Sequence, residues 1–356
     1  MSSKLPVLRI AGLEISPPII QGGMGVRVSG ARLAAAVANE GCAGTIASVG
    51  LGKFEESTGR HFVQLNDDAL REEIHKARRM SNGVIGVNVM VALSNYESLV
   101  RAAVEAKADF IISGAGLPFD LPGIVGDSKI ALIPIVSSAR ALNIICSKWK
   151  KSHNRLPDAV VVEGPLAGGH LGFKHEALAD HTNANLEALV AEVLEFTNTL
   201  DKPIPVIAAG GIYDGKDIVK VLNMGAAGVQ MATRFVCTDE CDADERFKAT
   251  YLNCEEDDIA IIHSPVGMPA RVIKNAFVQK IALGETVPFI CDYRCLRSCD
   301  PSTAPFCIAK VLVDAAKGNM DEAFAFAGSN AWRCTEIIPV KTLVKKLVEE
   351  AEAVSV

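Results

Sequence analysis

The sequence has few aromatic residues, no excess of positive charge and no long apolar run. Phe, Tyr and Trp make up 5% of the 356 residues, and 36 Lys and Arg stand against 42 Asp and Glu, a net charge of −6. This balance offers no basic surface for nucleic acid or an anionic membrane. No stretch reaches the roughly 20 apolar residues of a membrane helix, and the opening MSSKLPVLRI lacks the apolar core of a signal peptide. We therefore expect a cytoplasmic protein that binds neither nucleic acid nor membrane.

The hydrophobic residues are mostly aliphatic. They make up 49% of the chain, and 29 glycines are interspersed among them. A chain of this length can bury the core of one large α/β domain, or of a barrel with a smaller lobe. Runs of Val, Ile and Ala broken by Gly are typical of a parallel sheet covered by helices.

Eight short β-branched runs alternate with helical segments. Strands are expected at 18–21, 44–48, 84–89, 110–113, 130–136, 159–163, 205–209 and 228–232. Apolar residues at i, i+3 and i+4 predict helices at 30–39, 69–80, 98–107, 186–200 and 216–224. Strict β-then-α alternation indicates a parallel sheet, and eight units favour closure into a (β/α)8 TIM barrel. A doubly wound open sheet is the alternative.

The alternation stops after Thr233. We predict a barrel over 1–236 and a smaller, mostly helical second lobe over 237–320 that includes a Cys-rich stretch. Residues 321–356 are expected to form C-terminal helices that pack back on the barrel. Within the lobe, 251–269 has few strand signals, and its Pro265 and Gly267 predict an ordered loop.

Polar turns follow the seventh and eighth expected strands. Gly210 and Gly211 follow the seventh, whereas Gln230, Met231 and Thr233 end the eighth. In barrels of this kind the loops after these two strands often hold a phosphate. Adjacent glycines let backbone N–H groups approach a phosphate closely, and the positive ends of the following helices point to the same place. The sequence therefore predicts a phosphate site, with a simple tight turn at 210–211 as the alternative.

A series of motifs in consistent order resembles those of the nitronate monooxygenase (2-nitropropane dioxygenase) family, which is related to FMN-dependent enoyl-ACP reductases. They are PIIQGGMG at 18–25, GVNV at 86–89, EGPLAGGHLG at 163–172, the segments 205–211 and 225–235, and GMPAR at 267–271 with Lys274 and Asn275. The likeness runs from about residue 5 to 280. It implies an FMN-dependent oxidoreductase on a (β/α)8 barrel.

The resemblance implies an FMN site built from several strand ends. The expected cofactor-binding residues are Gly23, Met24, Gly25, Asn88, Ser137, Glu163, Gly168, Gly169, Gly210, Gly211, Gln230, Met231 and Thr233. The first three would lie along the isoalloxazine ring, Asn88 would bond the ring or the ribityl chain, and the last five would enclose the phosphate. Ser137 is included because it ends the fifth strand. Two positions depart from many relatives, since Leu166 replaces an acidic residue and Ala232 replaces a glycine.

His170 is the expected catalytic residue. The resemblance places it over the flavin ring, facing the substrate, and an imidazole can donate or accept a proton near neutral pH. A purely structural role in the glycine-rich loop is the alternative. The expected activity is oxidation of alkyl nitronates with O2. The alternative is an NAD(P)H-dependent enoyl-ACP reductase, or a flavin or quinone reductase, on the same scaffold. The expected partners are a small-molecule substrate and, in the alternative, NAD(P)H, and a homodimer is compatible with the sequence.

Four cysteines follow the pattern C-x3-C-x3-C-x7-C, at Cys291, Cys295, Cys299 and Cys307. Thiolates at such short spacing can hold zinc or an iron–sulfur cluster. If the segment is helical, three of the thiols share one face, which equally fits a buried stripe. We favour buried, inert thiols and assign no metal site. Metal binding and disulfides remain as alternatives.

Overall fold

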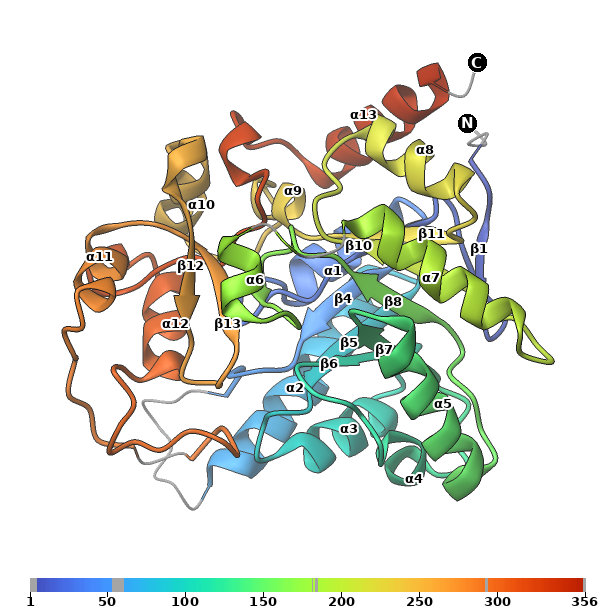
Figure 1. The fold of residues 1–356 in the computed structure, drawn as a ribbon, viewed down its shortest axis with the longest axis horizontal. Coiled ribbons are helices and arrows are strands. Elements are labelled where there is room, and N and C mark those ends of the chain that lie inside the picture. Colours follow the sequence, from blue (N-terminus) through green and yellow to red (C-terminus); the bar gives the residue numbers. More distant parts are fainter. Residues whose placement is uncertain (1–4, 53–60, 181, 183–184, 292–293, 355–356) are drawn as a thin grey trace.

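Eight parallel strands form the centre of the molecule. The computed structural model describes residues 5–52, 61–180, 182, 185–291 and 294–354 (Figure 1). The strands are β3 (Ile19–Gln21), β4 (Gly44–Ala47), β5 (Ile85–Met90), β6 (Phe110–Gly114), β7 (Ala131–Val136), β8 (Val160–Glu163), β10 (Val206–Ala209) and β11 (Gly228–Met231). All eight coincide with predicted runs. The prediction of the strands is confirmed.

The sheet closes on itself. Its order is β3-β11-β10-β8-β7-β6-β5-β4, and its two ends meet where Ile20 of β3 bridges Ala43, the residue before β4. The Gln21 N–H donates to the Ala43 carbonyl at 2.9 Å. The barrel prediction is therefore confirmed, and the alternative of an open sheet is wrong.

Apolar side chains fill the inside of the barrel. Ile20, Phe110, Ile133, Val161 and Ile207 belong to one fully buried cluster. Gly86 makes room for it, because a Cβ at this position would lie 2.2 Å from the Phe110 ring. The hairpin of β1 (Leu8–Ile10) and β2 (Leu13–Ile15) adds its own apolar residues to the same cluster.

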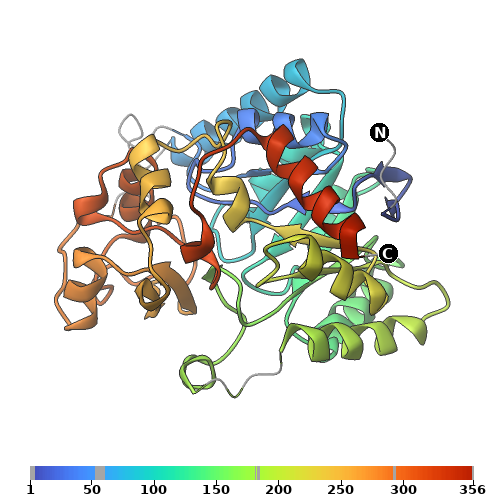
Figure 2. The same cartoon turned by 90° about the horizontal axis from the view of Figure 1, so that it is seen from above.

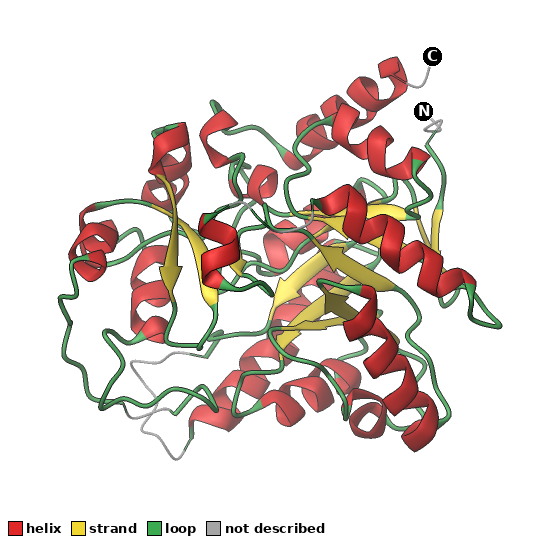
Figure 3. Ribbon diagram, viewed as in Figure 1, coloured by secondary structure: helices red, strands yellow, loops and turns green. Residues whose placement is uncertain are grey.

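Helices cover the outside of the barrel (Figure 3). They are α1 (Ala31–Asn39), α2 (Phe62–Met80), α3 (Tyr96–Glu105), α4 (Leu121–Val125), α5 (Ala139–His153), α7 (Leu186–Asn198) and α8 (Gly215–Asn223). With the exception of α4, which has no charged residue, each buries apolar residues against the strands and shows charged side chains to solvent. The final helix, α13 (Val340–Val354), lies against α8, as Figures 1 and 2 show.

A second lobe lies beside the barrel, at the left of Figure 1. Its helices are α10 (Glu245–Leu252), α11 (Ala276–Ala282) and α12 (Ile308–Ala316), and the short helices α6 (His175–Ala179) and α9 (Thr233–Val236) lie between it and the barrel. Three 3-10 turns complete the regular structure, at Glu256–Asp258, Met320–Glu322 and Ala331–Arg333. The exact boundaries at 236 and 320 stay predictions.

The lobe also contains a sheet that the sequence did not indicate. Strands β12 (Ile259–His263) and β13 (Pro269–Ile273) form an antiparallel hairpin, and β13 pairs in turn with β9 (Gly169–His170) from the barrel loop after β8. The prediction of a loop over 251–269 is therefore wrong for 259–263 and for residue 269. The residues of β12 are only half-buried, so no clean alternation marks the strand.

In the part of the chain that the structure describes, no helix has the length and apolar character needed to cross a membrane.

Candidate active site

One cavity lies at the C-terminal ends of the barrel strands, and seven of the strands and the segment directly after the eighth, β3, contribute to it. Its barrel side is lined by Gly22, Gly23 and Met24 after β3, Ala47, Asn88, Met90, Gly114, Ile135, Glu163, Ala209, Gln230 and Met231. The second lobe closes the opposite side, with Phe247, Tyr251, Val266, Ile308 and Leu312 among the lining residues. This end of a (β/α)8 barrel is where its enzymes carry their active sites.

The structure brings nearly all of the predicted site residues together. His170 and the predicted cofactor-binding residues line this one cavity, with the exception of Ser137. The Ser137 hydroxyl instead donates to the carbonyl of Gly172 at 3.0 Å, just beyond the AGGH segment. Residues from five segments that are distant in the sequence thus share one surface. The role of each toward a cofactor stays a prediction.

The segment after β3 presents bare backbone to the cavity. A Cβ on Gly23 would lie 2.3 Å from the Cβ of Asn88, and one on Gly25 would lie 2.2 Å from Cγ1 of Val49. Both distances are well below any normal contact, so only glycine fits at either position. The chain here lies directly on β5 and on the loop after β4. A flat ligand can approach such a backbone closely because no side chain stands in the way.

The predicted phosphate end is formed by two neighbouring turns and by a third segment. Gly210 and Gly211 adopt φ values of +91° and +89°, which favour glycine. Asn330 donates to the Gly211 carbonyl at 2.7 Å, and Thr233 Oγ1 accepts the N–H of Gly328 at 3.1 Å. The segment around 328–330 therefore joins both turns. The contribution of this segment could not be predicted from the sequence, because no local motif marks it and it lies about 100 residues further along the chain.

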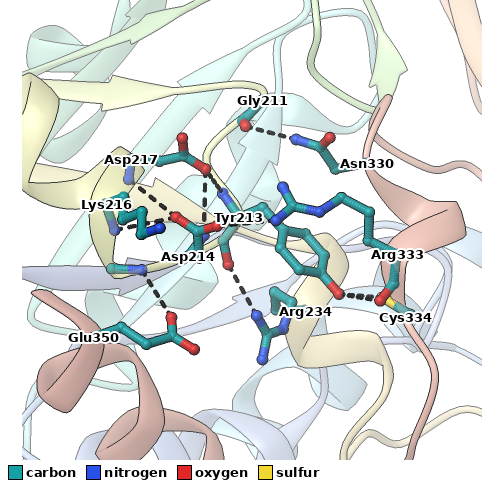
Figure 4. Close-up of polar contacts among 11 residues, drawn as sticks. Gly211, Tyr213, Asp214, Lys216, Asp217, Arg234, Asn330, Arg333, Cys334 and Glu350 are labelled. Atoms are coloured by element: carbon teal, nitrogen blue, oxygen red, sulfur yellow. Dashed lines mark hydrogen bonds and ion pairs between the residues drawn. The ribbon is translucent and has the colours of Figure 1, made fainter.

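A cluster of charged residues of both signs lies next to the Gly211 turn (Figure 4). The guanidinium groups of Arg234 and Arg333 lie 4.4 Å and 4.0 Å from the centre of the Tyr213 ring. Arg333 pairs with Asp214 at 2.9 Å, whereas Arg234 donates to the Tyr213 carbonyl at 3.1 Å. Asp217 also belongs to this cluster, where it accepts the Tyr213 N–H at 2.8 Å, so the two guanidinium groups lie among acids and their charges are largely balanced.

One polar group in the cavity lacks a partner. Gln230 lines the cavity, and its buried Oε1 accepts no hydrogen bond from the described residues. A buried acceptor without a partner costs about 1–3 kcal/mol. A ligand that carries N–H or O–H donors would remove this cost. Gln230 therefore fits a ligand with polar groups at this depth.

His170 stands where the barrel and the lobe meet. It lies on β9, paired with Ala270 of β13, and its Nε2 lies 2.8 Å from the Ser264 hydroxyl. The Phe326 ring meets the imidazole edge-on, with 5.0 Å between the ring centres. Burial lowers the pKa of His170 to about 4. The imidazole is therefore neutral at neutral pH and can accept a proton within the cavity.

Glu163 is a second titratable group on the cavity wall. It ends β8, and burial raises the pKa of its carboxyl to about 7. At neutral pH a large fraction of this carboxyl is protonated, so that it can donate as well as accept a hydrogen bond. The neutral imidazole of His170 and the partly protonated carboxyl of Glu163 thus line the same cavity.

Arg271 of β13 holds the loop that leads to His170. This buried guanidinium donates to the carbonyls of Pro165 and Ala167, at 2.7 Å and 2.5 Å. Burial lowers the pKa of Arg271 to about 10, which still leaves the side chain charged at neutral pH. The sequence placed Arg271 in a family motif but gave it no role, because its partners lie about 100 residues away.

Leu166 belongs to the same loop. Its side chain is 46% exposed, lines the cavity and lies close to the Gly211 turn. Where many relatives carry an acid, this chain therefore shows an apolar surface to the ligand.

A barrel of eight parallel strands with a cavity of this kind at its mouth is the architecture of an enzyme. The chain belongs to the nitronate monooxygenase family, whose model matches residues 8–100 and 94–350. The predicted family and enzyme class are thus confirmed.

The relatives carry more than one name. The chain is 29% identical over 292 residues to (3aS,4S,5R,7aS)-5-hydroxy-7a-methyl-1-oxo-octahydro-1H-indene-4-carboxyl-CoA dehydrogenase of Mycobacterium tuberculosis, covering 80% of this chain and 70% of that protein. It is 28% identical over 303 residues to a probable nitronate monooxygenase of Staphylococcus aureus, covering 76% of this chain and 79% of that protein.

Solved structures show the same fold. FabK from Thermotoga maritima matches with a TM-score of 0.74 and 27% identity, covering 95% of this chain and 93% of that one. Nitroalkane oxidase from Streptomyces ansochromogenes also matches with a TM-score of 0.74, at 22% identity, covering 95% of this chain and 96% of that one. The latter likeness concerns the fold alone.

Proposed function

We propose that the chain is an FMN-dependent oxidoreductase that oxidises alkyl nitronates with O2. FMN is the cofactor that the family resemblance implies, and the residues present fit it. Bare backbone at Gly23 and Gly25 suits a flat ring, the unpaired Gln230 Oε1 suits a donor on the cofactor, and the turns at 210–211 and 231–233 suit its phosphate. When bound, FMN would take two electrons from the substrate and return them to O2.

The observation that carries the proposal is the neutral His170 on the cavity wall. Burial lowers the pKa of this imidazole to about 4, which keeps the ring neutral and one nitrogen unprotonated but makes it a weak base for the α-proton of a neutral nitroalkane. For a nitronate, which is already an anion, an imidazole N–H can donate to a nitro oxygen. Ser264 and Phe326 fix the ring in place for either task.

A second candidate function is the NAD(P)H-dependent reduction of an enoyl thioester. The observation that favours it is the apolar wall that the second lobe adds to the cavity, including Leu296, Ile308 and Leu312. This wall and the uncharged Leu166 suit an acyl chain better than a small nitro compound. The names of two similar proteins, FabK and a CoA-thioester dehydrogenase, agree with such a substrate.

Anaerobic mixing separates the two candidates. The FMN-loaded protein is mixed with propyl-2-nitronate, NADH or NADPH, and the visible absorption of the flavin is followed. Bleaching by the nitronate alone is the expected result, whereas bleaching by a nicotinamide alone would establish the second candidate in its place. A purified protein that binds no FMN would refute both.

The role of His170 is tested separately. His170→Ala should lower kcat/KM by about 10²–10⁴ if the imidazole acts as a general base. FMN content should hardly change. His75→Ala, at an exposed position on α2, is the matched control and should behave as the natural protein. Full activity of the His170 variant on every substrate tested would rule out the proposed role.

A further inference from the structure

We propose that one arm of the active-site cavity binds a long apolar part of the substrate, and that Asn95 recognises a hydroxyl group on that part. The arm is defined here by six residues that line the cavity: Phe62, Leu93, Asn95, Leu99, Leu296 and Leu312. This inference deepens the proposed function and rests on it in one respect, namely that the reacting end of the substrate lies at His170. It holds whether that end is a nitronate or a thioester.

The arm comes from parts of the chain that the expected FMN site does not use. Phe62 begins α2, and Leu312 lies on α12. Leu93 and Asn95 lie between β5 and α3, and Leu99 lies on α3 itself. None of these residues is among the expected contacts of the flavin. The arm is therefore open to the substrate when those contacts are made.

Apolar side chains form most of the wall of the arm, and the backbone holds them in place. The residue Leu296 of the lobe bridges Leu93, and the Ser94 N–H donates to the Cys295 carbonyl at 3.0 Å. These contacts fix the lobe to the segment after β5. A wall of this kind favours an apolar ligand, because each CH2 group that leaves water for it strengthens binding about three- to fourfold.

The Cys-rich stretch contributes to this part of the cavity. Its members Cys291, Cys295, Cys299 and Cys307 are free thiols, and each is partly exposed instead of fully buried. Cys295 lines the cavity next to Leu296. Among the residues that the structure describes, no three His, Cys, Asp or Glu side chains form a group suited to a metal ion. The role that the structure gives to this stretch is therefore that of a cavity wall.

Asn95 is a polar residue of the arm whose side chain has no partner. It is only 7% exposed and lines the cavity, yet its amide makes no hydrogen bond with the described residues. It stands at the N-cap of α3, where an asparagine side chain usually accepts an N–H of the first turn, but no such bond forms here. The backbone carbonyl of Asn95, not its side chain, accepts the Ser98 hydroxyl at 3.1 Å. The amide is therefore left for a ligand.

The buried amide of Asn66, which also lines the cavity, behaves differently. Its Nδ2 donates to the Phe62 carbonyl at 2.7 Å, and its Oδ1 accepts the Gly52 N–H at 3.2 Å. Asn66 is thus part of the framework, whereas Asn95 carries the cost of a buried polar group without a partner. An amide offers both donors and an acceptor, and a hydroxyl group can meet both kinds. A carbonyl group would leave the amide oxygen of Asn95 unpaired, so a hydroxyl group is the better fit.

The arm and His170 lie on different sides of the cavity. Asn95 follows β5 and His170 follows β8, and the strands β6 and β7 stand between these two in the barrel. Adjacent strands are about 4.8 Å apart, so three such spacings separate β5 from β8 along the barrel wall. A substrate that extends from His170 to Asn95 therefore needs a chain or ring system several carbons long.

Binding of unreactive carboxylates tests the inference without turnover. A carboxylate has the planar shape and the charge of a nitronate head group, but it gives no electrons to a flavin. The probes are ω-hydroxy carboxylates of six to ten carbons, the isosteres in which a methyl group replaces each hydroxyl, and butanoate as the short reference. Calorimetry in the presence of FMN gives dissociation constants for the natural protein, Asn95→Leu and Asn223→Leu. Asn223 is exposed at the end of α8 and provides the matched control.

In the natural protein, the longest methyl-ended carboxylates should bind at least about 100-fold more tightly than butanoate. At one or two chain lengths, the hydroxy compound should bind about tenfold more tightly than its isostere. Asn95→Leu should reverse this preference, because the methyl end then meets an apolar side chain, whereas Asn223→Leu should keep it.

Three results would overturn the inference: no gain in affinity with chain length, equal binding within every pair, or an unchanged preference in Asn95→Leu. The natural protein alone decides the first two, so poor folding of the variant leaves the test intact. Failure of the proposed function shows elsewhere, since a flavin that no nitronate bleaches refutes that function whatever the carboxylates do.

Discussion

Replacing Arg271 by Met tests whether the lobe positions the catalytic loop. The change removes two hydrogen bonds from a charged donor, to the carbonyls of Pro165 and Ala167. Such bonds contribute about 1.5–3 kcal/mol each. Against this, burial lowers the pKa of Arg271 from 12.5 to about 10, which means that the buried charge costs about 3 kcal/mol. The two effects nearly cancel, so Arg271→Met should lower the free energy of unfolding by only about 1–2 kcal/mol.

The effect on activity should be much larger than the effect on stability. Without the guanidinium, the loop of 165–167 loses its anchor, and His170 follows only three residues later. A displacement of about 1 Å at a catalytic group can cost 10²-fold in rate. We therefore expect kcat/KM of Arg271→Met to fall by about 10²-fold, while its melting temperature falls by only a few degrees.

Steady-state kinetics and thermal unfolding of the same preparations measure both effects. Arg271→Lys keeps the charge but lacks the forked geometry, so its loss of activity should be intermediate. Arg101→Met, which removes an exposed arginine paired with Glu97 on α3, is the control and should change neither quantity. If Arg271→Met kept kcat/KM within about twofold of the natural value, the idea that the lobe positions His170 would be refuted.

Three further predictions concern the cavity itself. Ser264→Ala removes the hydrogen-bond partner of His170 and should lower kcat/KM by about tenfold with little change in FMN affinity. Kinetics and flavin titration measure the two quantities. An equal loss of both would point to general disruption of the site. Gly23→Ala places a Cβ against Asn88 and should weaken FMN binding at least tenfold, measured by fluorescence titration, whereas unchanged affinity would show that the ring binds elsewhere. Glu163→Gln tests how protonation of Glu163 is coupled to folding. The pKa of Glu163 is raised from 4.5 to about 7, so between these pH values the folded state binds more protons than the unfolded state. As pH rises through this range, Glu163 therefore destabilises the folded state. The variant should therefore gain stability over the natural protein between pH 5 and 7, by up to about 3 kcal/mol in urea unfolding without FMN, and equal slopes would contradict the raised pKa.

The strands and the glycine turn at 210–211 were predictable because the signals that mark them are local. A strand buried on both faces needs an unbroken apolar run, as in Val160–Glu163 and Val206–Ala209, and such runs are visible in the sequence. Gly210 and Gly211 are marked by their adjacency, since few other positions need two consecutive residues at positive φ. The alternating order of strands and helices then predicted the barrel, and the barrel predicted that the site lies at the C-terminal ends of its strands.

The partners that fix His170 were not predictable in the same way. Ser264, Arg271 and Phe326 reach the AGGH loop from 94, about 100 and about 150 residues away. None of them carries a local signal, because serine, arginine and phenylalanine are common in any lobe. Ser137 directly follows β7 as expected, but its hydroxyl donates to the Gly172 carbonyl, and its role toward a cofactor stays a prediction.

The two-residue strand β9 explains why barrel and lobe act as one catalytic unit. Its residues Gly169 and His170 are paired with Arg271 and Ala270 of the lobe, and this strand is too short to be stable without them. Ser264 lies in the turn between β12 and β13, and Arg271 lies on β13 itself, so two of the groups that orient His170 belong to one hairpin, and the third, Phe326, bridges Val272 of β13. The barrel alone can form the floor of the cavity, but the position of the imidazole above that floor is set by the lobe. Substitutions within this hairpin should therefore change kcat more than cofactor affinity, whereas substitutions at the strand ends of the barrel should do the reverse.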